Sequence, residues 1–177
     1  MRENDKARSR GFSLIEVTLA MSILAVGLLG GIVVIGVATA NNGRSKQHTT
    51  AATLAESTME KIVAIPSSAT GAATQTQITD CAGNAFTIET SPGGSPLINS
   101  GAFAGSIDFS QAPAPNYSMA YLMCSSGTGV TYDVRWRVDA GPTPGTQLVT
   151  VSAKTAGGSG TSIFTLPYTL HQLRGDF

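Results

Sequence analysis

The sequence predicts an α+β fold in which one long N-terminal helix packs on a C-terminal antiparallel β-sheet. The first observation behind this prediction is an uncharged run of 24 residues, from Val17 to Ala40. The second is a series of apolar residues at three- and four-residue steps between Ala51 and Ile65, which indicates an amphipathic helix. The third is the alternation of apolar and polar residues from Tyr132 to Asp139, which indicates a strand with one buried face.

The uncharged run is long enough to cross a membrane. At about 1.5 Å per helical residue it spans roughly 36 Å, against about 30 Å for the hydrocarbon core of a bilayer. The segment before it is mostly basic, with Arg2, Lys6, Arg8 and Arg10 against Glu3 and Asp5. Because positive charge favours the cytoplasmic side, we expect a single pass through the inner membrane and a periplasmic C-terminal domain.

Three interpretations of this N-terminal segment compete. A cleaved secretory signal has a short apolar core before its small-residue cleavage site, whereas the A-x-A pattern at Ala38–Ala40 follows a long one. A plain signal anchor explains the apolar run and the basic tail, but it does not explain the residues around Gly11. The third interpretation starts from those residues.

The residues GFSLIE at Gly11–Glu16, directly before the uncharged run, resemble the processing site of the type IV prepilin family. The resemblance implies that a prepilin peptidase cuts between Gly11 and Phe12 and removes residues 1–11 as a leader peptide. It also implies that the new amino group of Phe12 is methylated. Glu16 then becomes the fifth residue of the mature chain, the position that the family uses in subunit assembly.

Physical chemistry gives Glu16 and the new N-terminus complementary roles. An ionised carboxylate inside a membrane costs about 2.5 to 3.5 kcal/mol on insertion scales, so it needs a partner. The amino group of Phe12 is mostly cationic at neutral pH. A neighbouring subunit shifted along the helix axis brings the two charges together. The alternative is an interfacial Glu16 whose side chain extends toward the lipid headgroups.

The helix is expected to continue from Phe12 to Ile65, because Pro66 stops it. Residues 12–40 form its transmembrane and assembly half, and residues 41–65 form its amphipathic half. Gly27 and Gly31 have the small-xxx-small spacing of closely packed helices. The stripe that we expect to face the sheet consists of Ala51, Leu54, Ala55, Met59, Ile62 and Ile65.

Residues 66–177 are expected to form a globular, β-rich head domain. Ser67–Gln77 is rich in small polar residues and is predicted to be a loop. The turn sequences GPTPG at Gly141–Gly145 and GGSG at Gly157–Gly160 join the last strands as hairpins, which makes the sheet antiparallel. The predicted strands are Ala85–Thr90, Ser106–Phe109, Tyr117–Cys124, Tyr132–Val138, Leu148–Lys154 and Ile163–Leu170. The side chains expected to point inward from the last two are Val149, Val151, Ala153, Phe164, Leu166, Tyr168 and Leu170.

The two cysteines, Cys81 and Cys124, both follow the membrane segment. An oxidising compartment allows them to form a disulfide, which closes a loop of about 44 residues and stabilises the fold by about 3 to 4 kcal/mol. Free buried thiols are the alternative. No group of His, Cys or Asp residues has the spacing of metal ligands, so the sequence predicts neither a metal site nor a cofactor.

The sequence gives little support to an enzyme, because it shows no paired carboxylates together with a nucleophile. The formal net charge is zero, so no long-range field attracts nucleic acid or acidic lipid. His48 is expected in a polar linker and His171 near the end of a strand, both outside any catalytic motif. We therefore expect a protein without catalytic residues.

Arg135 and Arg137 flank Trp136, and basic residues next to an aromatic residue can bind nucleic acid. The alternation of the strand places Trp136 on the opposite face from the two arginines. Asp133 and Asp139 lie on the arginine face. We therefore expect a solvated face with local ion pairs and no nucleic-acid partner.

Three longer sequence segments indicate which subclass of the family the chain resembles. They are ILAVGLLGG at Ile23–Gly31, TLAESTMEKI at Thr53–Ile62 and YDVRWRV at Tyr132–Val138. Together they are similar to PilV-type minor pilins, and also to the I class of type II secretion pseudopilins. The resemblance implies a minor pilin that is incorporated into, primes or modifies a type IV pilus. Its implied partners are other pilin subunits and the prepilin peptidase/N-methyltransferase. A pseudopilin at the tip of a secretion pseudopilus is one alternative, and a pilus-borne adhesin or DNA-uptake module is another.

Overall fold

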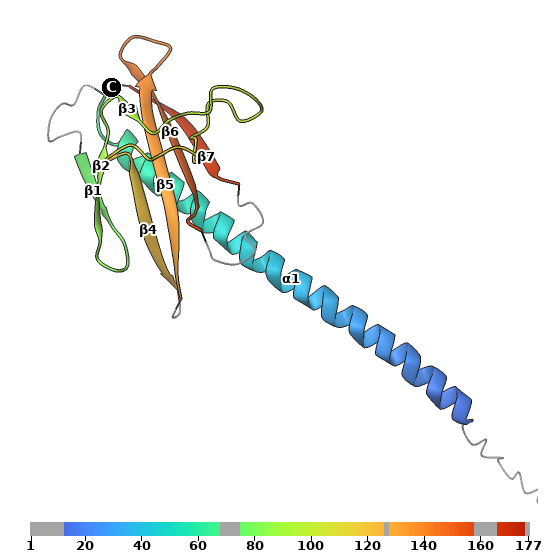
Figure 1. Cartoon of the computed structure of the whole chain (residues 1–177). Coiled ribbons are helices and arrows are strands. Elements are labelled where there is room, and N and C mark those ends of the chain that lie inside the picture. Colours follow the sequence, from blue (N-terminus) through green and yellow to red (C-terminus); the bar gives the residue numbers. More distant parts are fainter. Residues whose placement is uncertain (1–12, 68–74, 126–127, 158–165, 176–177) are drawn as a thin grey trace, which may run out of the picture. The chain divides into compact units, whose positions relative to one another are not determined.

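The computed structural model of the chain describes residues 13–67, 75–125, 128–157 and 166–175. Within these ranges a single α-helix is followed by β-strands (Figure 1). The chain divides into two compact units, residues 1–44 and 45–177, and the helix contributes residues to both. The elements are α1 (Leu14–Val63), β1 (Gln75–Thr79), β2 (Ala85–Glu89), β3 (Gly93–Gly94), β4 (Ser118–Ser125), β5 (Thr128–Ala140), β6 (Thr146–Thr155) and β7 (Tyr168–Gly175).

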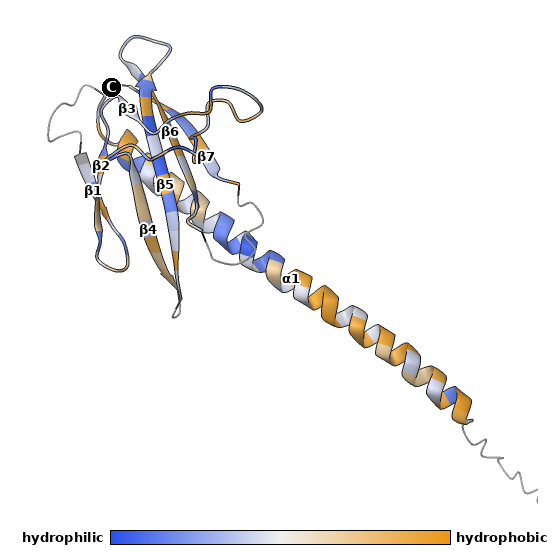
Figure 2. Cartoon of the chain, viewed as in Figure 1, coloured by the Kyte–Doolittle hydropathy of each residue, from blue (hydrophilic) through white to orange (hydrophobic). Residues whose placement is uncertain are grey.

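The large apolar side chains in the first half of α1 are all exposed. Figure 2 shows that the ribbon of this half is predominantly hydrophobic in colour. By length and composition α1 qualifies as a membrane span, and none of its most apolar window is buried. The hydroxyl groups of Thr18, Ser22 and Thr39 donate hydrogen bonds to carbonyl oxygens three or four residues earlier in the helix. These polar groups are therefore satisfied within the helix, as a membrane segment requires.

Helix α1 ends at Val63, two residues before the predicted end at Ile65. The ring of Pro66 disfavours helical geometry at the residue before it, so the last turn loosens early. The side chain of Arg174 then caps this end, because its Nη1 donates to the carbonyl oxygens of Ile62 at 2.8 Å and Ile65 at 3.2 Å. A cation at a helix C-terminus also interacts favourably with the helix dipole.

The main sheet is antiparallel and is built around β5. The strand order is β3-β5-β6-β7, and β4 pairs with β5 as well. Strand β4 pairs with residues 128–135 and β3 pairs with residues 137–138, so the two follow each other along one side of β5. The approach of β3 requires glycine, because a Cβ on Gly94 would lie 2.6 Å from the Cα of Arg137.

The second half of α1 packs on one face of this sheet (Figure 1). Trp136 at the centre is fully buried, and its Nε1 donates to the carbonyl oxygen of Glu89 at 2.8 Å. The predicted stripe is buried except for Ile65, which is half-buried, and Thr58 joins it through a hydrogen bond to the carbonyl of Leu54. The buried sheet residues on this face are Val134, Val138, Val149, Val151 and Ala153. The pilin-like α+β architecture predicted from the sequence is thus confirmed.

A separate two-stranded sheet, β1–β2, corrects part of the predicted loop Ser67–Gln77. Residues 75–77 are strand, paired antiparallel with residues 87–89 of β2, and residues 68–74 lie outside the described ranges. The sequence of β1 is too polar to predict this pairing, and among Thr76–Thr79 only Ile78 is buried. Only part of the predicted loop is therefore accounted for by the described residues.

The turn between β1 and β2 is tied to β4. The disulfide Cys81–Cys124 joins them, with a Cα–Cα distance of 5.9 Å. The carboxylate of Asp80 accepts hydrogen bonds from the backbone N–H groups of Ala82, Asn84 and Leu122. Desolvation raises the pKa of Asp80, but hydrogen bonds from the side chain and backbone of Asn84 and from the other N–H groups lower it below its ordinary value.

The outer face of the sheet is not simply solvated, which corrects the prediction for Arg135. The expected ion pairs are present, Arg135–Asp133 at 2.8 Å and Arg137–Asp139 at 2.8 Å. However, the segment before β4 covers Arg135, whose Nη1 donates to the carbonyl of Gln111 at 2.8 Å. The guanidinium also lies 4.8 Å from the ring centre of Phe109. Arg135 is consequently buried, with 7 % of its surface exposed.

Two predicted strands are misplaced. Residues 106–109 form no strand, although Ile107 makes an isolated bridge with Leu97. The last strand begins at Tyr168 instead of Ile163 and continues to Gly175. Leu166 and Tyr168, which the sequence predicts to point inward, are exposed instead, because Tyr168 begins β7, the edge strand of the main sheet, and Leu166 precedes it. The predictions for residues 158–165, including most of the GGSG turn and Phe164, fall outside the described ranges.

Candidate assembly and processing site

Glu16 lies in the first turn of α1, two residues after the residue that begins the helix. The carbonyl oxygen of Ser13 accepts hydrogen bonds from the N–H groups of Glu16 at 3.0 Å and Val17 at 3.2 Å. Ser13 therefore occupies the N-cap position, and Glu16 follows within the turn where the helix dipole favours an acidic side chain. The backbone hydrogen bonds of this turn therefore fix the position of Glu16 near the start of the helix.

Glu16 lines a groove whose other described lining residues are apolar. This shallow groove along the helix is lined by Glu16, Val17, Ala20, Met21 and Leu24, which follow the one-, four-, five- and eight-residue steps of one flank. Each of the large apolar residues in this set is well exposed. The flank thus presents one carboxylate at the end of an uncovered apolar strip.

Within the described residues Glu16 has no ion-pair partner. It is also the only acidic or basic residue between Leu14 and Gly43. A carboxylate in hydrocarbon is costly without a counter-charge, so the partner of Glu16 has to come from outside this part of the helix. Gly11 and Phe12, which the sequence places at the cleavage site, lie outside the described ranges.

The comparison with protein-family models finds the prokaryotic N-terminal methylation motif at residues 6–32. The match includes the end of the basic leader, Gly11, Phe12, Glu16 and the first part of the apolar run. The chain is a type IV prepilin-like protein. Comparisons with curated proteins and with solved structures found no match.

The prepilin motif implies processing by a prepilin peptidase and assembly with other pilins. Together with the apolar first half of α1, it fits anchoring in a membrane and incorporation into a pilus. Proteins of the type IV pilin-like family are structural subunits and not enzymes.

The two histidines lie on different elements, and the described contacts do not bring them together in one site. His48 belongs to α1, which corrects its prediction as part of a linker, and it is exposed. His171 belongs to β7, where its Nδ1 is 3.0 Å from the hydroxyl oxygen of Thr150. Among the described residues no group of three or more His, Cys, Asp or Glu side chains could hold a metal ion.

One surface feature of this prepilin-like protein is not evident from the sequence pattern. A groove of about 410 Å³ lies between the start of the head's helical segment and the end of the β4–β5 hairpin. Its walls come from two parts of the chain: Ser45, Lys46, Gln47, Thr49 and Thr50 of the helix, and Met123, Val130 and Tyr132 of the hairpin. No local pattern signals such a groove, because residues from distant parts of the chain meet there.

Proposed function

We propose that this chain is a minor pilin, a subunit that joins, primes or modifies a type IV pilus after processing by prepilin peptidase. The observation that carries the proposal is the methylation motif at residues 6–32 in a chain whose described residues beyond Arg44 form a folded helix-and-sheet head. The sequences of residues 23–31, 53–62 and 132–138 are most similar to PilV-type minor pilins, although they are similar to I-class pseudopilins as well.

In this proposal each segment has one task. Residues 1–11 are the leader that the peptidase removes, and residues 12–40 anchor the subunit and later pack in the filament. Residues 41–65 continue the helix into the head, and residues 66–177 complete the head. The basic leader favours a cytoplasmic N-terminus and a head on the periplasmic side, with a single pass between them.

Assembly in this proposal depends on Glu16 and on the methylated amino group of Phe12. An exposed carboxylate on an otherwise uncharged flank supports this role, because it is stable in a dry bundle only beside a cation. The amino group created by cleavage is the cation that every copy of the mature subunit carries. A neighbour shifted along the axis brings that amino group to Glu16 and neutralises both charges.

The alternative is a type II secretion pseudopilin, which would use the same N-terminal processing and the same pairing of charges. A tagged copy expressed in its native host distinguishes a minor pilin from a pseudopilin. The minor-pilin proposal expects the chain in filaments sheared from the cell surface, and expects pilus number or function to change when its gene is deleted. Absence from sheared filaments, with loss of protein secretion on deletion, would support the pseudopilin instead.

A further inference from the structure

The groove between α1 and the β4–β5 hairpin has two chemically distinct parts. Its hairpin wall is apolar, with Met123 and Val130 paired directly across the two strands and Tyr132 behind them. Its helix wall is polar, with Lys46 followed by Thr49 and Thr50. A ligand that fits both walls must itself carry an apolar part and a polar part.

Lys46 gives the polar wall a positive charge. Its side chain is exposed, and among the described residues it forms no hydrogen bond or ion pair. None of the residues that line the groove is acidic. The neighbouring hydroxyls of Thr49 and Thr50 donate to helix carbonyls at 3.0 Å, so their oxygens remain available as acceptors. The wall therefore suits an anion that also carries hydroxyl groups.

The position of Lys46 in the chain identifies the source of such a ligand. Lys46 follows Ala40, the last residue of the uncharged run, by six residues. Both residues lie in α1, so the six residues from Ala40 to Lys46 span about 9 Å. Since the interfacial region of a bilayer is several ångströms deep on each side, Lys46 stays within reach of the lipid headgroups whenever the uncharged run is in the membrane.

We propose that this groove binds the headgroup of an anionic phospholipid of the membrane that holds the subunit before assembly. Lys46 contacts the phosphate, and Thr49 and Thr50 accept hydrogen bonds from headgroup hydroxyls. Met123 and Val130 contact the glycerol backbone and the first carbons of an acyl chain, and the buried Tyr132 supports them from behind. A volume of about 410 Å³ lies within the range of about 300 to 1,000 Å³ typical of ligand pockets.

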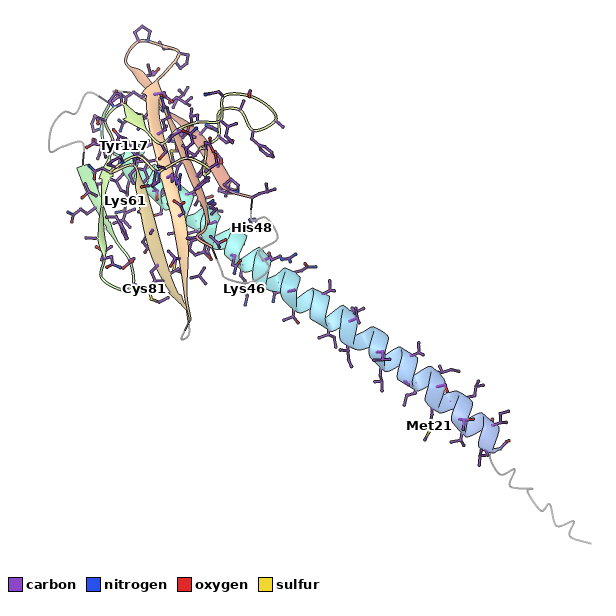
Figure 3. The ribbon with its side chains drawn as sticks, in the orientation of Figure 1. Met21, Lys46, His48, Lys61, Cys81 and Tyr117 are labelled. Carbon is purple, nitrogen blue, oxygen red and sulfur yellow. A yellow bond between two sulfur atoms is a disulfide. The ribbon has the colours of Figure 1, made fainter. Side chains whose placement is uncertain are left out.

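The proposal goes beyond the proposed minor-pilin function and rests on its membrane anchoring alone. Bound lipid holds this groove at the membrane surface, and the lipid is released when the subunit is extracted into a filament. Lys61 provides a matched control, because it lies on the same helix at the opposite end of the head's helical segment (Figure 3). It carries the same charge as Lys46 but lines no part of the groove.

The test uses the full mature chain in phosphatidylcholine vesicles that contain phosphatidylglycerol with a photoreactive headgroup. After irradiation, mass spectrometry locates the lipid-labelled peptides. We expect labelling in residues 45–50 and 123–132, reduced about fivefold by Lys46→Gln, the effect of one lysine at an anionic surface, and unchanged by Lys61→Gln. Met123→Gln, which makes the hairpin wall polar, is expected to reduce labelling as well.

Several results would overturn the lipid site. Equal labelling of the wild type and Lys46→Gln, labelling confined to the apolar run, or crosslinks between two copies of the chain at these peptides would each do so. Flotation of the same vesicles measures anchoring separately. A chain that floats with the vesicles without groove labelling disproves the lipid site and leaves the minor-pilin proposal intact, whereas a chain that does not float disproves the anchoring on which both depend.

Discussion

The two halves of α1 belong to one helix, but the first half exposes its apolar side chains and the second half buries them. From Leu14 to Val37 every large apolar side chain is more than 40 % exposed. From Ala51 to Ile62 the apolar side chains form a stripe that is almost fully buried against the sheet. The described residues leave the apolar surface of the first half uncovered, which fits membrane anchoring and incorporation into a pilus, whereas the second half is covered by its own chain.

This difference separates stability from assembly. Changes in the second half, or in the sheet that covers it, should alter the free energy of unfolding of the head. Changes in the first half should leave that free energy unchanged and alter only membrane insertion or incorporation. Substitutions matched between the two halves can therefore show whether the two properties are separate.

The largest effect is expected from Glu16→Ala, which leaves the amino group of a neighbouring Phe12 unpaired in the filament. An unpaired buried charge typically costs about 3 to 5 kcal/mol, which corresponds to two or more decades in the assembly equilibrium. Incorporation is measured by comparing sheared filaments with membrane-retained protein. Glu16→Asp should be partly defective, because its shorter side chain must reach the same amine.

The control for Glu16→Ala is Glu56→Ala, which removes an exposed carboxylate from the second half of the same helix. It should be incorporated normally. Normal incorporation of the Glu16→Ala protein would show that this charge pair does not recruit the subunit, and would leave that task to the apolar helix and the head.

Trp136→Ala should lower the free energy of unfolding of the head strongly, since Trp136 is the largest fully buried side chain among the described residues. Truncations of this kind cost about 3 to 5 kcal/mol through lost burial and the cavity left behind. Leu28→Ala is the matched change in the first half, where the side chain is 61 % exposed. Denaturant unfolding in detergent, followed by circular dichroism, should show a lower midpoint for Trp136→Ala only. A similar shift for Leu28→Ala would contradict the separation of the halves.

Replacing both cysteines by serine should destabilise the head by about 3 to 4 kcal/mol, because the disulfide restricts a long loop in the unfolded chain. Thermal unfolding of the Cys81→Ser/Cys124→Ser protein measures the loss. Addition of a reductant to the wild type should reproduce it and should have no effect on the double variant. Thiol labelling of the denatured, unreduced wild type should be negative, and two free thiols would refute the bond.

The smallest effect is a pH dependence from Asp80. Because its folded-state pKa is below the ordinary value of 3.8, the carboxylate stabilises the fold fully above that value, and the contribution is lost as the pH falls through the folded-state pKa. Asp80→Asn should therefore be less stable than the wild type at neutral pH, and the difference should shrink below about pH 4. Asp108, whose pKa is also lowered by hydrogen bonds from Ser110 and Gln111, is present in both proteins and does not affect the difference. Stability curves that stay parallel through the acid range would exclude this role.

The sequence predicted most reliably the elements whose pattern is local. The stripe from Ala51 to Ile62 and the alternation around Trp136 are both repeated within a few residues, so one buried face could be assigned from period alone. The prepilin site is also local, because its residues are consecutive and directly precede the apolar run. These features needed no knowledge of distant contacts.

The remaining features depend on contacts between distant residues. Strand β1 is almost entirely polar and is defined by its pairing with β2. Arg135 and Arg174 are buried by segments far away in sequence, which satisfy their guanidinium groups with backbone carbonyls, whereas arginine is ordinarily expected at the surface. The groove beside Lys46 likewise arises where the helix and the β4–β5 hairpin meet, so composition could not reveal it.

The central claim is that this chain becomes an assembly-competent subunit only after cleavage between Gly11 and Phe12. Intact-mass and N-terminal peptide mass spectrometry of the protein purified from its native host tests that claim directly. We expect a chain that begins with N-methylated Phe12 and ends unchanged. A chain that retains Met1 and the leader, or one that begins after Ala40, would contradict it.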